Sequence, residues 1–157
     1  MSGQPKLLLD WCSAKAAKYA CENWHYTRQM PCFKTSKIGV WENGLFRGCL
    51  IYTSPFPTIR KRFKCSKTEM TELARVALRG HDAPVSKMIR ISLKMIKKAN
   101  PGLKVCVSYA DTSQGHHGGI YQGSGFKYFG EGTTSWEYWY NGKWTHCRSV
   151  CMARDRG

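Results

Sequence analysis

The sequence predicts a single α/β (α+β) domain built on a mixed, mostly antiparallel sheet that is flanked by helices. Two stretches have the pattern of a hairpin with an Asn-Gly turn, and two others have the composition or the apolar spacing of a helix. A helix that separates two groups of strands is typical of α/β proteins. Because 157 residues is the size of one compact domain, we expect one domain over residues 1–157, with loose ends.

The first half of the chain predicts a strand, a helix and a hairpin. The apolar run in PKLLLDW predicts a strand, and Ser13 is a suitable N-cap for the alanine- and lysine-rich helix that continues to about Trp24. Residues 36–54 predict two strands joined by Asn43-Gly44, a dipeptide that supplies the positive φ of a type I′ turn. The basic stretch 55–68 has no regular period, which predicts an irregular loop.

The second half predicts a strand, a long helix and further strands. Residues 70–80 predict a strand, and helical apolar spacing begins at Val85 and stops at Asn100-Pro101-Gly102. Length and β-branching predict a buried strand over residues 103–109. The remaining predicted elements are a short helix in the glycine-rich segment 108–126, a strand over 126–132 and a second hairpin over 135–150 around Asn141-Gly142.

The charge of the chain favours a polyanionic partner. Twenty-five Lys and Arg against ten Asp and Glu give a net charge of +15, so nucleic acid is the first candidate and an anionic membrane surface the second. The chain has no apolar run long enough to cross a membrane and no signal-peptide pattern, which predicts a soluble, cytoplasmic protein. The eight Cys predict reduced, mostly buried thiols, and the His146–Cys151 segment lacks the second ligand pair of a structural zinc site.

Several motifs resemble those of a known family. They are HY at residues 25–26, ELARV at 72–76, Ser86 at the start of a helix, SYAD at 108–111 and GHHGGIYQGSGFKYFG at 115–130. The element order resembles the GNAT acyltransferase fold, and the motifs are similar to those of the phage Mom family of DNA-modifying proteins. The resemblance implies an enzyme that converts the N6 amine of adenine in duplex DNA to an N6-carbamoylmethyl group, which protects phage DNA from restriction endonucleases.

Two other functions fit parts of the sequence. A GNAT-type N-acetyltransferase that uses acetyl-CoA on a protein or small-molecule amine would need a preserved CoA loop and no large positive charge. A DNA-coating module without catalysis would explain the charge of +15 but not the Asp, His and Tyr residues among glycines. The resemblance implies acetyl-CoA or another acyl-CoA and Fe²⁺ as cofactors, in a bacterial host cell. The oligomeric state stays open, with a homodimer among the options.

The resemblance selects five residues for catalysis. They are Asp111, Tyr121, His25, Tyr26 and Arg75. Asp111 follows a predicted inner strand, where ligands of open α/β sheets bind, although an Asp also caps turns there. A carboxylate at this position would accept the proton of adenine N6, and Tyr121 would act as a general acid or pack in the core. Arg75 in an apolar strand needs an anionic partner, either Asp111 or a substrate phosphate, in a structural or a catalytic role.

The resemblance also implies an iron site and a cofactor site. His25, Tyr26, Asp111 and Tyr121 offer the nitrogen and oxygen ligands that Fe²⁺ accepts, although a His-Tyr pair after a helix is commonly structural. Of the GNAT pyrophosphate loop, only Arg79-Gly80 has a counterpart here, and Ser86 at a helix N-terminus is a generic anion site. The candidates for cofactor binding are therefore Ser86, Arg79, Gly80, His116 and Gly118.

Seven cations in two predicted loops are candidates for binding double-stranded DNA. They are Arg28, Lys34, Lys37, Arg60, Lys61, Arg62 and Lys64. Phe33, Phe56 and Phe63 lie among them, a combination that suits phosphate contacts with apolar insertion, although a solvated surface is the simpler explanation. Chemistry at N6 inside a duplex requires the base to flip out, so an aromatic side chain should stack on it. The candidates for stacking are Trp41, Trp136 and Tyr138.

Overall fold

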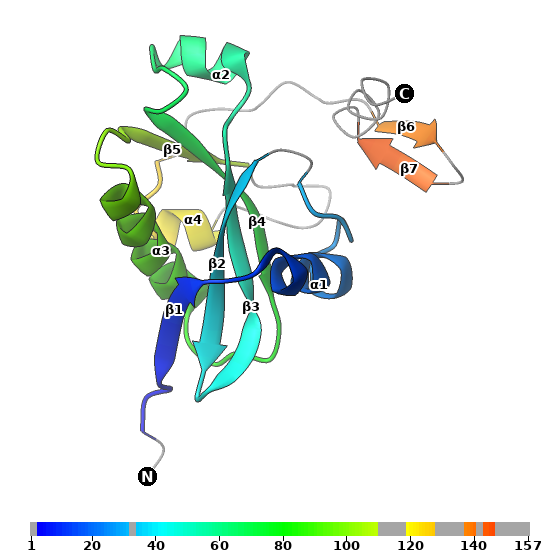
Figure 1. The fold of residues 1–157 in the computed structure, drawn as a ribbon, viewed down its shortest axis with the longest axis vertical. Helices are drawn as coiled ribbons and strands as arrows, with labels where there is room; N and C mark the ends of the chain where they lie inside the picture. The colour runs from blue at the N-terminus through cyan, green and yellow to red at the C-terminus, as the bar shows by residue number, and fades with distance from the viewer. Residues whose placement is uncertain (1–2, 32–33, 110–118, 128–136, 141–142, 147–157) are drawn as a thin grey trace. The chain divides into compact units, whose positions relative to one another are not determined.

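The computed structural model describes residues 3–31, 34–109, 119–127, 137–140 and 143–146. Contacts divide the chain into two compact units, residues 1–127 and 128–157, so the single domain stays a prediction. The first unit contains β1 (Leu7–Trp11), α1 (Ala14–Trp24), β2 (Thr35–Glu42), β3 (Leu45–Thr53), α2 (Pro57–Arg62), β4 (Met70–Leu78), α3 (Val85–Ala99), β5 (Val105–Ser108) and α4 (Gly119–Gly123) (Figure 1). In the second unit, β6 (Glu137–Tyr140) pairs antiparallel with β7 (Lys143–His146).

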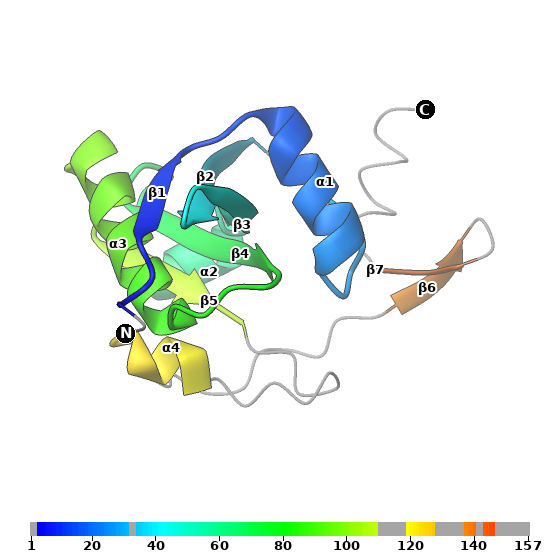
Figure 2. The same ribbon diagram turned by 90° about the horizontal axis from the view of Figure 1, so that it is seen from below.

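The strands of the first unit form one mixed sheet in the order β1-β2-β3-β4-β5. All neighbouring pairs are antiparallel except β4 and β5, which are parallel because α3 connects them as a crossover. α1 and α3 lie on opposite faces of the sheet (Figure 2). The predicted α/β class with a mixed, mostly antiparallel sheet is confirmed.

Each face of the sheet has its own apolar cluster. The cluster on the α3 side contains Ile38, Val40, Leu50, Tyr52, Leu73, Ala83, Met88, Ile89, Ile96 and Leu103. The cluster on the α1 side contains Ala17, Ala20, Cys21, Cys49, Ile51 and Ala77. A buried hydrogen bond of 2.6 Å between Tyr52 Oη and Ser92 Oγ joins β3 to α3. Side chains of the strands alternate between the two clusters, as the period of a β-strand requires.

Local signals in the sequence place the ends of several elements correctly. The Ser13 side chain accepts the N–H of Ala16 at 3.1 Å, which confirms it as the N-cap of α1. Asn43 and Gly44 have φ values of 53° and 81°, as a type I′ turn requires. The Asn100 N–H bonds the Ile96 carbonyl at 2.9 Å where α3 ends. These caps and turns set the lengths of the elements that carry the candidate site.

The structure differs from the sequence prediction at two places. Residues 57–62 form the helix α2 instead of an irregular loop, because Pro57 suits a first helical turn and the three cations 60–62 suit a last one. β5 is half-buried instead of buried, since within the described ranges it pairs only with β4. The second hairpin is confirmed, although its turn at 141–142 and most of the predicted strand 126–132 lie outside those ranges.

The five cysteines in the described ranges have free thiols. Cys21 and Cys49 are buried, and Cys12, Cys65 and Cys106 are half-buried. The zinc pattern at residues 146–151 lies almost wholly outside the described ranges. Within those ranges, no helix combines the length and the apolar character that crossing a bilayer requires.

Candidate functional site

A β-bulge in β4 sets the geometry of the candidate site. Arg75 of β4 pairs with Ile51 of β3. Leu73 pairs with Tyr52, the next residue of β3, so residue 74 is an extra residue. Residues three apart in a regular strand face opposite sides, but the extra residue puts Glu72 and Arg75 on the same side. That side is the one covered by α1, because Ile51 belongs to the apolar cluster there.

Arg75 attaches the loop that follows α1 to this side of the sheet. Its Nε donates to the Gln29 carbonyl at 3.2 Å, and its Nη1 donates to the Ala74 carbonyl at 2.9 Å. The predicted anionic partners are Asp111, which lies outside the described residues, and a substrate phosphate. The bond to Gln29 shows that Arg75 positions residues 25–31 over the sheet.

His25 and Tyr26 form a stacked pair at the exit of α1. Their ring centroids are 4.4 Å apart, with 32° between the ring planes. His25 Nδ1 accepts the Thr27 N–H at 3.2 Å and lies 2.7 Å from Thr27 Oγ1. Because Nδ1 accepts, the proton of the neutral ring is assigned to Nε2. Tyr26 is 45% exposed, so a ligand can reach this pair.

Thr53 and Glu72 are two further polar residues on the same side of the sheet, and neither was predicted from the sequence. They pair directly across β3 and β4, and only 4% and 5% of their surfaces are exposed. The buried Oγ1 of Thr53 has no hydrogen-bond partner among the residues that the structure describes. The available signal was the acidic residue inside the apolar strand MTELARVAL, since a Glu is seldom buried without a specific reason.

Tyr121 lies on the other side of the sheet. Its ring packs edge-on against Phe126 with centroids 5.7 Å apart, and both residues pack against the apolar cluster of the α3 side. Arg90 of α3 fixes α4 in place by donating from Nη2 to the Gly123 carbonyl at 2.8 Å. The described residues therefore do not bring Tyr121 to the His25 loop.

The segment with Asp111, His116 and Gly118 lies outside the described residues. The strand that leads into it is described. Ser108, the last residue of β5, pairs with Leu73 and donates from Oγ to the Leu73 carbonyl at 3.0 Å. The carboxyl end of β5 therefore lies beside the bulge of β4.

The described residues do not fit the iron site that the resemblance implies. In the part of the chain that the structure describes, no three His, Cys, Asp or Glu side chains form a group that could hold a metal ion. His25 and Tyr26 lie at the exit of α1, whereas Tyr121 packs on the α3 side.

An internal carboxylate fills the loop that the resemblance assigns to the CoA pyrophosphate. Glu42 of β2 is 1% exposed and accepts the N–H of Asp82 at 2.8 Å and the N–H of Ala83 at 2.7 Å. The Asp82 hydrogen bond, followed by the Ala83 hydrogen bond, lowers the pKa of Glu42. The backbone donors that precede α3 are thus already bound to an anion.

The predicted cofactor residues around this loop differ in accessibility, since Arg79 and Gly80 are exposed and Ser86 is half-buried. The Arg79 N–H donates to the Arg47 carbonyl at 2.9 Å, and Gly80 has a φ of 68° in the turn that follows. Ser86 lies under α4, because a Cβ added at Gly123 would come within 3.5 Å of the Ser86 Cβ. Within the described residues, Glu42 occupies the backbone donors of Asp82 and Ala83, and CoA binding by Arg79, Gly80 and Ser86 stays a prediction.

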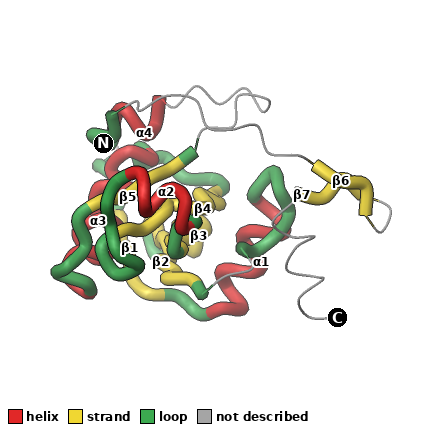
Figure 3. Tube along the Cα trace, turned by 90° about the horizontal axis from the view of Figure 1, so that it is seen from above, coloured by secondary structure: helices red, strands yellow, loops and turns green. Residues whose placement is uncertain are grey.

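The two predicted basic loops meet at one end of the sheet. Thr35, the first residue of β2, pairs with Thr53, the last residue of β3. The chain before β2 and the chain after β3 therefore leave the sheet at the same end, where α2 lies (Figures 1 and 3). The exposed cations at this end are Lys34, Lys61, Arg62 and Lys64.

The other three predicted DNA contacts have structural bonds or are less exposed. Arg28 has a φ of 54° and donates from Nη1 to the Asn23 carbonyl at 2.9 Å, which caps the end of α1. Lys37 is half-buried and donates from Nζ to the Thr35 carbonyl at 3.2 Å. Arg60 is half-buried, and its buried Nε has no hydrogen-bond partner in the described part of the chain.

Of the three aromatic candidates for base stacking, Trp41 has a described side chain, and it does not lie at this end. Trp41 packs against Phe46 with ring centroids 5.5 Å apart, near the turn of the β2-β3 hairpin and away from α2. Phe56 is 41% exposed just before α2, and Phe63 follows that helix. Phe33, Trp136 and the side chain of Tyr138 lie outside what the structure describes.

A comparison with known families gives one match. The model of the Mom protein family matches residues 6–157. The matched range includes all the helices and strands described above. No curated protein matches the chain.

Proposed function

Because the chain belongs to the Mom protein family, we propose that it converts the N6 amine of adenine in double-stranded DNA to an N6-carbamoylmethyl group. Membership of this family indicates a phage protein that modifies DNA. The proposed product would protect phage DNA from restriction endonucleases. The observation that carries the proposal is the pairing of Thr53 with both Thr35 and Glu72, which puts the polar residues of the bulge next to the cationic end of the sheet.

The proposed chemistry assigns the proton of N6 to a carboxylate. The N6 nitrogen forms a bond to the methylene carbon of the donor and loses one hydrogen as a proton, while the donor's leaving group departs with the bonding electron pair. N6 is a weak nucleophile because its lone pair is conjugated with the ring, so a base that accepts this proton accelerates the step. We assign this role to Asp111, and we assign no step to Tyr121 because its ring packs on the α3 side of the sheet, away from the His25 loop. Arg75 is the positioning residue that holds the His25 loop.

The solvent face of α3 extends the proposed DNA-binding surface. Lys87, Arg90, Lys94 and Lys98 are exposed and recur every three or four residues, so they share one face of the helix. α3 has no acidic residue, and the ion pairs found in the described ranges involve other residues. Like charges at this spacing repel one another, and Lys87 in the first turn also opposes the helix dipole. A polyanion bound along α3 would relieve both effects.

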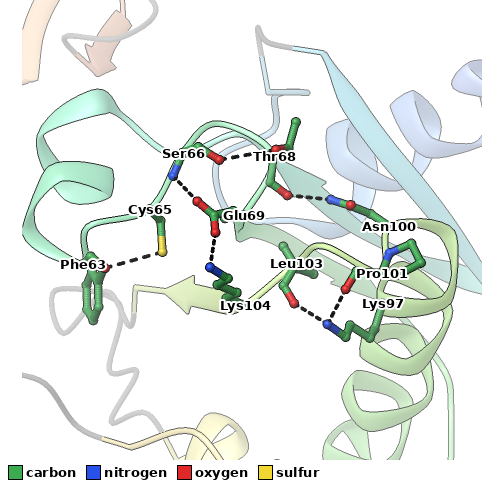
Figure 4. Close-up of polar contacts among 10 residues, drawn as sticks. All are labelled: Phe63, Cys65, Ser66, Thr68, Glu69, Lys97, Asn100, Pro101, Leu103 and Lys104. Carbon is green, nitrogen blue, oxygen red and sulfur yellow. Dashed lines mark hydrogen bonds and ion pairs between the residues drawn. The ribbon is translucent and has the colours of Figure 1, made fainter.

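The corner between α2 and β4 connects the cations near α2 with those of α3 (Figure 4). Asn100, at the end of α3, donates from Nδ2 to the Thr68 carbonyl at 2.7 Å. Lys104 forms an ion pair with Glu69, whose carboxylate also accepts the Ser66 N–H at 2.9 Å. These contacts hold the end of α3 beside the loop that follows α2. A DNA backbone can therefore pass from α2 to α3 over one cationic surface.

The experiment incubates purified protein with plasmid DNA and a small-molecule extract of bacterial cells, which supplies the donor. The DNA is digested to nucleosides and analysed by mass spectrometry, and Asp111→Asn is the matched control. We expect N6-carbamoylmethyladenine with the wild type and none with Asp111→Asn. Acetylated protein with unchanged DNA would indicate an N-acetyltransferase instead. Tight DNA binding with unchanged nucleosides would indicate a coating module.

A further inference from the structure

Thr53 has a buried hydroxyl group that no described residue satisfies. The residue is 4% exposed, and within the described ranges no group donates to its Oγ1 or accepts from it. The Thr53 backbone carbonyl does have a partner, since it accepts the Thr71 hydroxyl at 3.1 Å. A buried polar group without a partner destabilises a fold, and Val would fill the same space without this cost. The hydroxyl therefore calls for an explanation other than stability.

The immediate neighbour of Thr53 is a buried carboxyl group. Glu72 lies directly opposite Thr53 in the β3-β4 ladder and is 5% exposed. Directly opposed residues have Cβ atoms about 5 Å apart and point to the same side of the sheet. The bulge adds the Arg75 guanidinium to that side, under the loop that carries His25. A hydroxyl, a carboxylate and a cation thus share one region beside the end of β5.

A hydroxyl next to a carboxylate complements one edge of adenine. The N6 amino group is a hydrogen-bond donor and suits a carboxylate, while the adjacent ring nitrogen is an acceptor and suits a hydroxyl. Guanine presents O6 at the place of this amino group, so the carboxylate would face a second acceptor and repel it. Cytosine has the same donor and acceptor on a smaller ring, and it serves as a control for size.

We propose that Thr53 and Glu72 form the subsite that recognises the adenine edge and holds its amino group. The inference rests on the proposed function for the identity of the base. Thr53 donates to the ring nitrogen, and Glu72 accepts from N6 while the reaction takes place on that nitrogen. Binding the base satisfies the Thr53 hydroxyl, so part of the stability lost in the free protein is regained in the complex.

The first test compares Thr53→Val, which keeps the shape and removes the hydroxyl, with Thr53→Ser, which keeps the hydroxyl. We expect Thr53→Val to melt at a higher temperature than the wild type and to lose about tenfold or more of the modification rate. Thr53→Ser should retain most of that rate. A lower melting temperature for Thr53→Val would mean that the hydroxyl is structural and would overturn the proposal. Modification at the wild-type rate by Thr53→Val would also overturn it.

The second test measures binding without any reaction. Deoxyadenosine, deoxyguanosine and deoxycytidine are added to the wild type, and the shift in melting temperature is recorded. We expect deoxyadenosine to give the largest shift, and both Thr53→Val and Glu72→Gln to reduce that shift. If deoxyadenosine is bound in this way but no DNA is modified, the proposed reaction fails and the subsite stands. If DNA is modified and deoxyadenosine gives no shift that depends on Thr53, the subsite fails and the reaction stands.

Discussion

Neutralising two cations of α3 should weaken DNA binding by a predictable amount. Lys94 and Lys98 are exposed one helical turn apart, and Lys→Gln preserves helix propensity. Each phosphate contact contributes about 0.9 to the slope of log affinity against log salt, so the Lys94→Gln/Lys98→Gln variant should lose about 1.8 from that slope. Between 50 and 200 mM salt, the affinity of the wild type should therefore fall about 12-fold more than that of the variant.

The matched control for this prediction is on α1. Lys15 and Lys18 are also exposed, and Lys18 already pairs with Glu22 at 3.8 Å. The assay is fluorescence anisotropy of a labelled duplex at several salt concentrations. We expect the Lys15→Gln/Lys18→Gln variant to keep the wild-type slope. If both double variants lose the same slope, the binding is an effect of net charge, and if the α3 variant keeps the wild-type slope, α3 does not contact DNA.

Three further predictions concern the fold around the site. The Lys104 ion pair, followed by the Ser66 hydrogen bonds, lowers the pKa of Glu69 from 4.5 to about 2. The ionised Glu69 side chain therefore stabilises the fold above pH 4.5, and this stabilisation is lost as the pH falls towards 2. Glu69→Gln should make the melting temperature depend less on pH in that range. A variant with the pH dependence of the wild type would contradict this prediction. Glu42→Gln should lower the melting temperature, because the Asp82 and Ala83 N–H groups lose a charged acceptor. Equilibrium dialysis should detect no CoA bound to the wild type, since Glu42 already occupies these donors. Saturable CoA binding would contradict the assignment of this loop to Glu42. Burial raises the pKa of the Cys106 thiol to about 12. Iodoacetamide at pH 8 should therefore leave Cys106 unmodified in the folded protein, which peptide mass spectrometry can check. Rapid alkylation of Cys106 would contradict this prediction.

The sequence predicts most of the fold because its signals are local. Ser13 and Asn43-Gly44 act within a few residues of their own positions, and both do what their chemistry predicts. α2 escapes prediction because its six residues are too few to show a helical period.

The site is harder to predict because it depends on distant pairings. Strict alternation along β4 puts Glu72 and Arg75 on opposite faces, and only the register with β3 reveals the bulge that brings them together. Glu42 likewise reads as an exposed residue beside a hairpin turn. It is buried because the loop at Asp82, forty residues further along the chain, donates to it.

The most direct test of the proposed modification uses cells, where every donor that the host makes is present. Plasmid DNA is isolated from bacteria that express the chain and from bacteria that express Asp111→Asn, and its nucleosides are separated and fragmented by mass spectrometry. We predict a carbamoylmethyl group on the adenine base in the first sample only. Four ordinary nucleosides in both samples, or the same new nucleoside in both, would contradict the proposal.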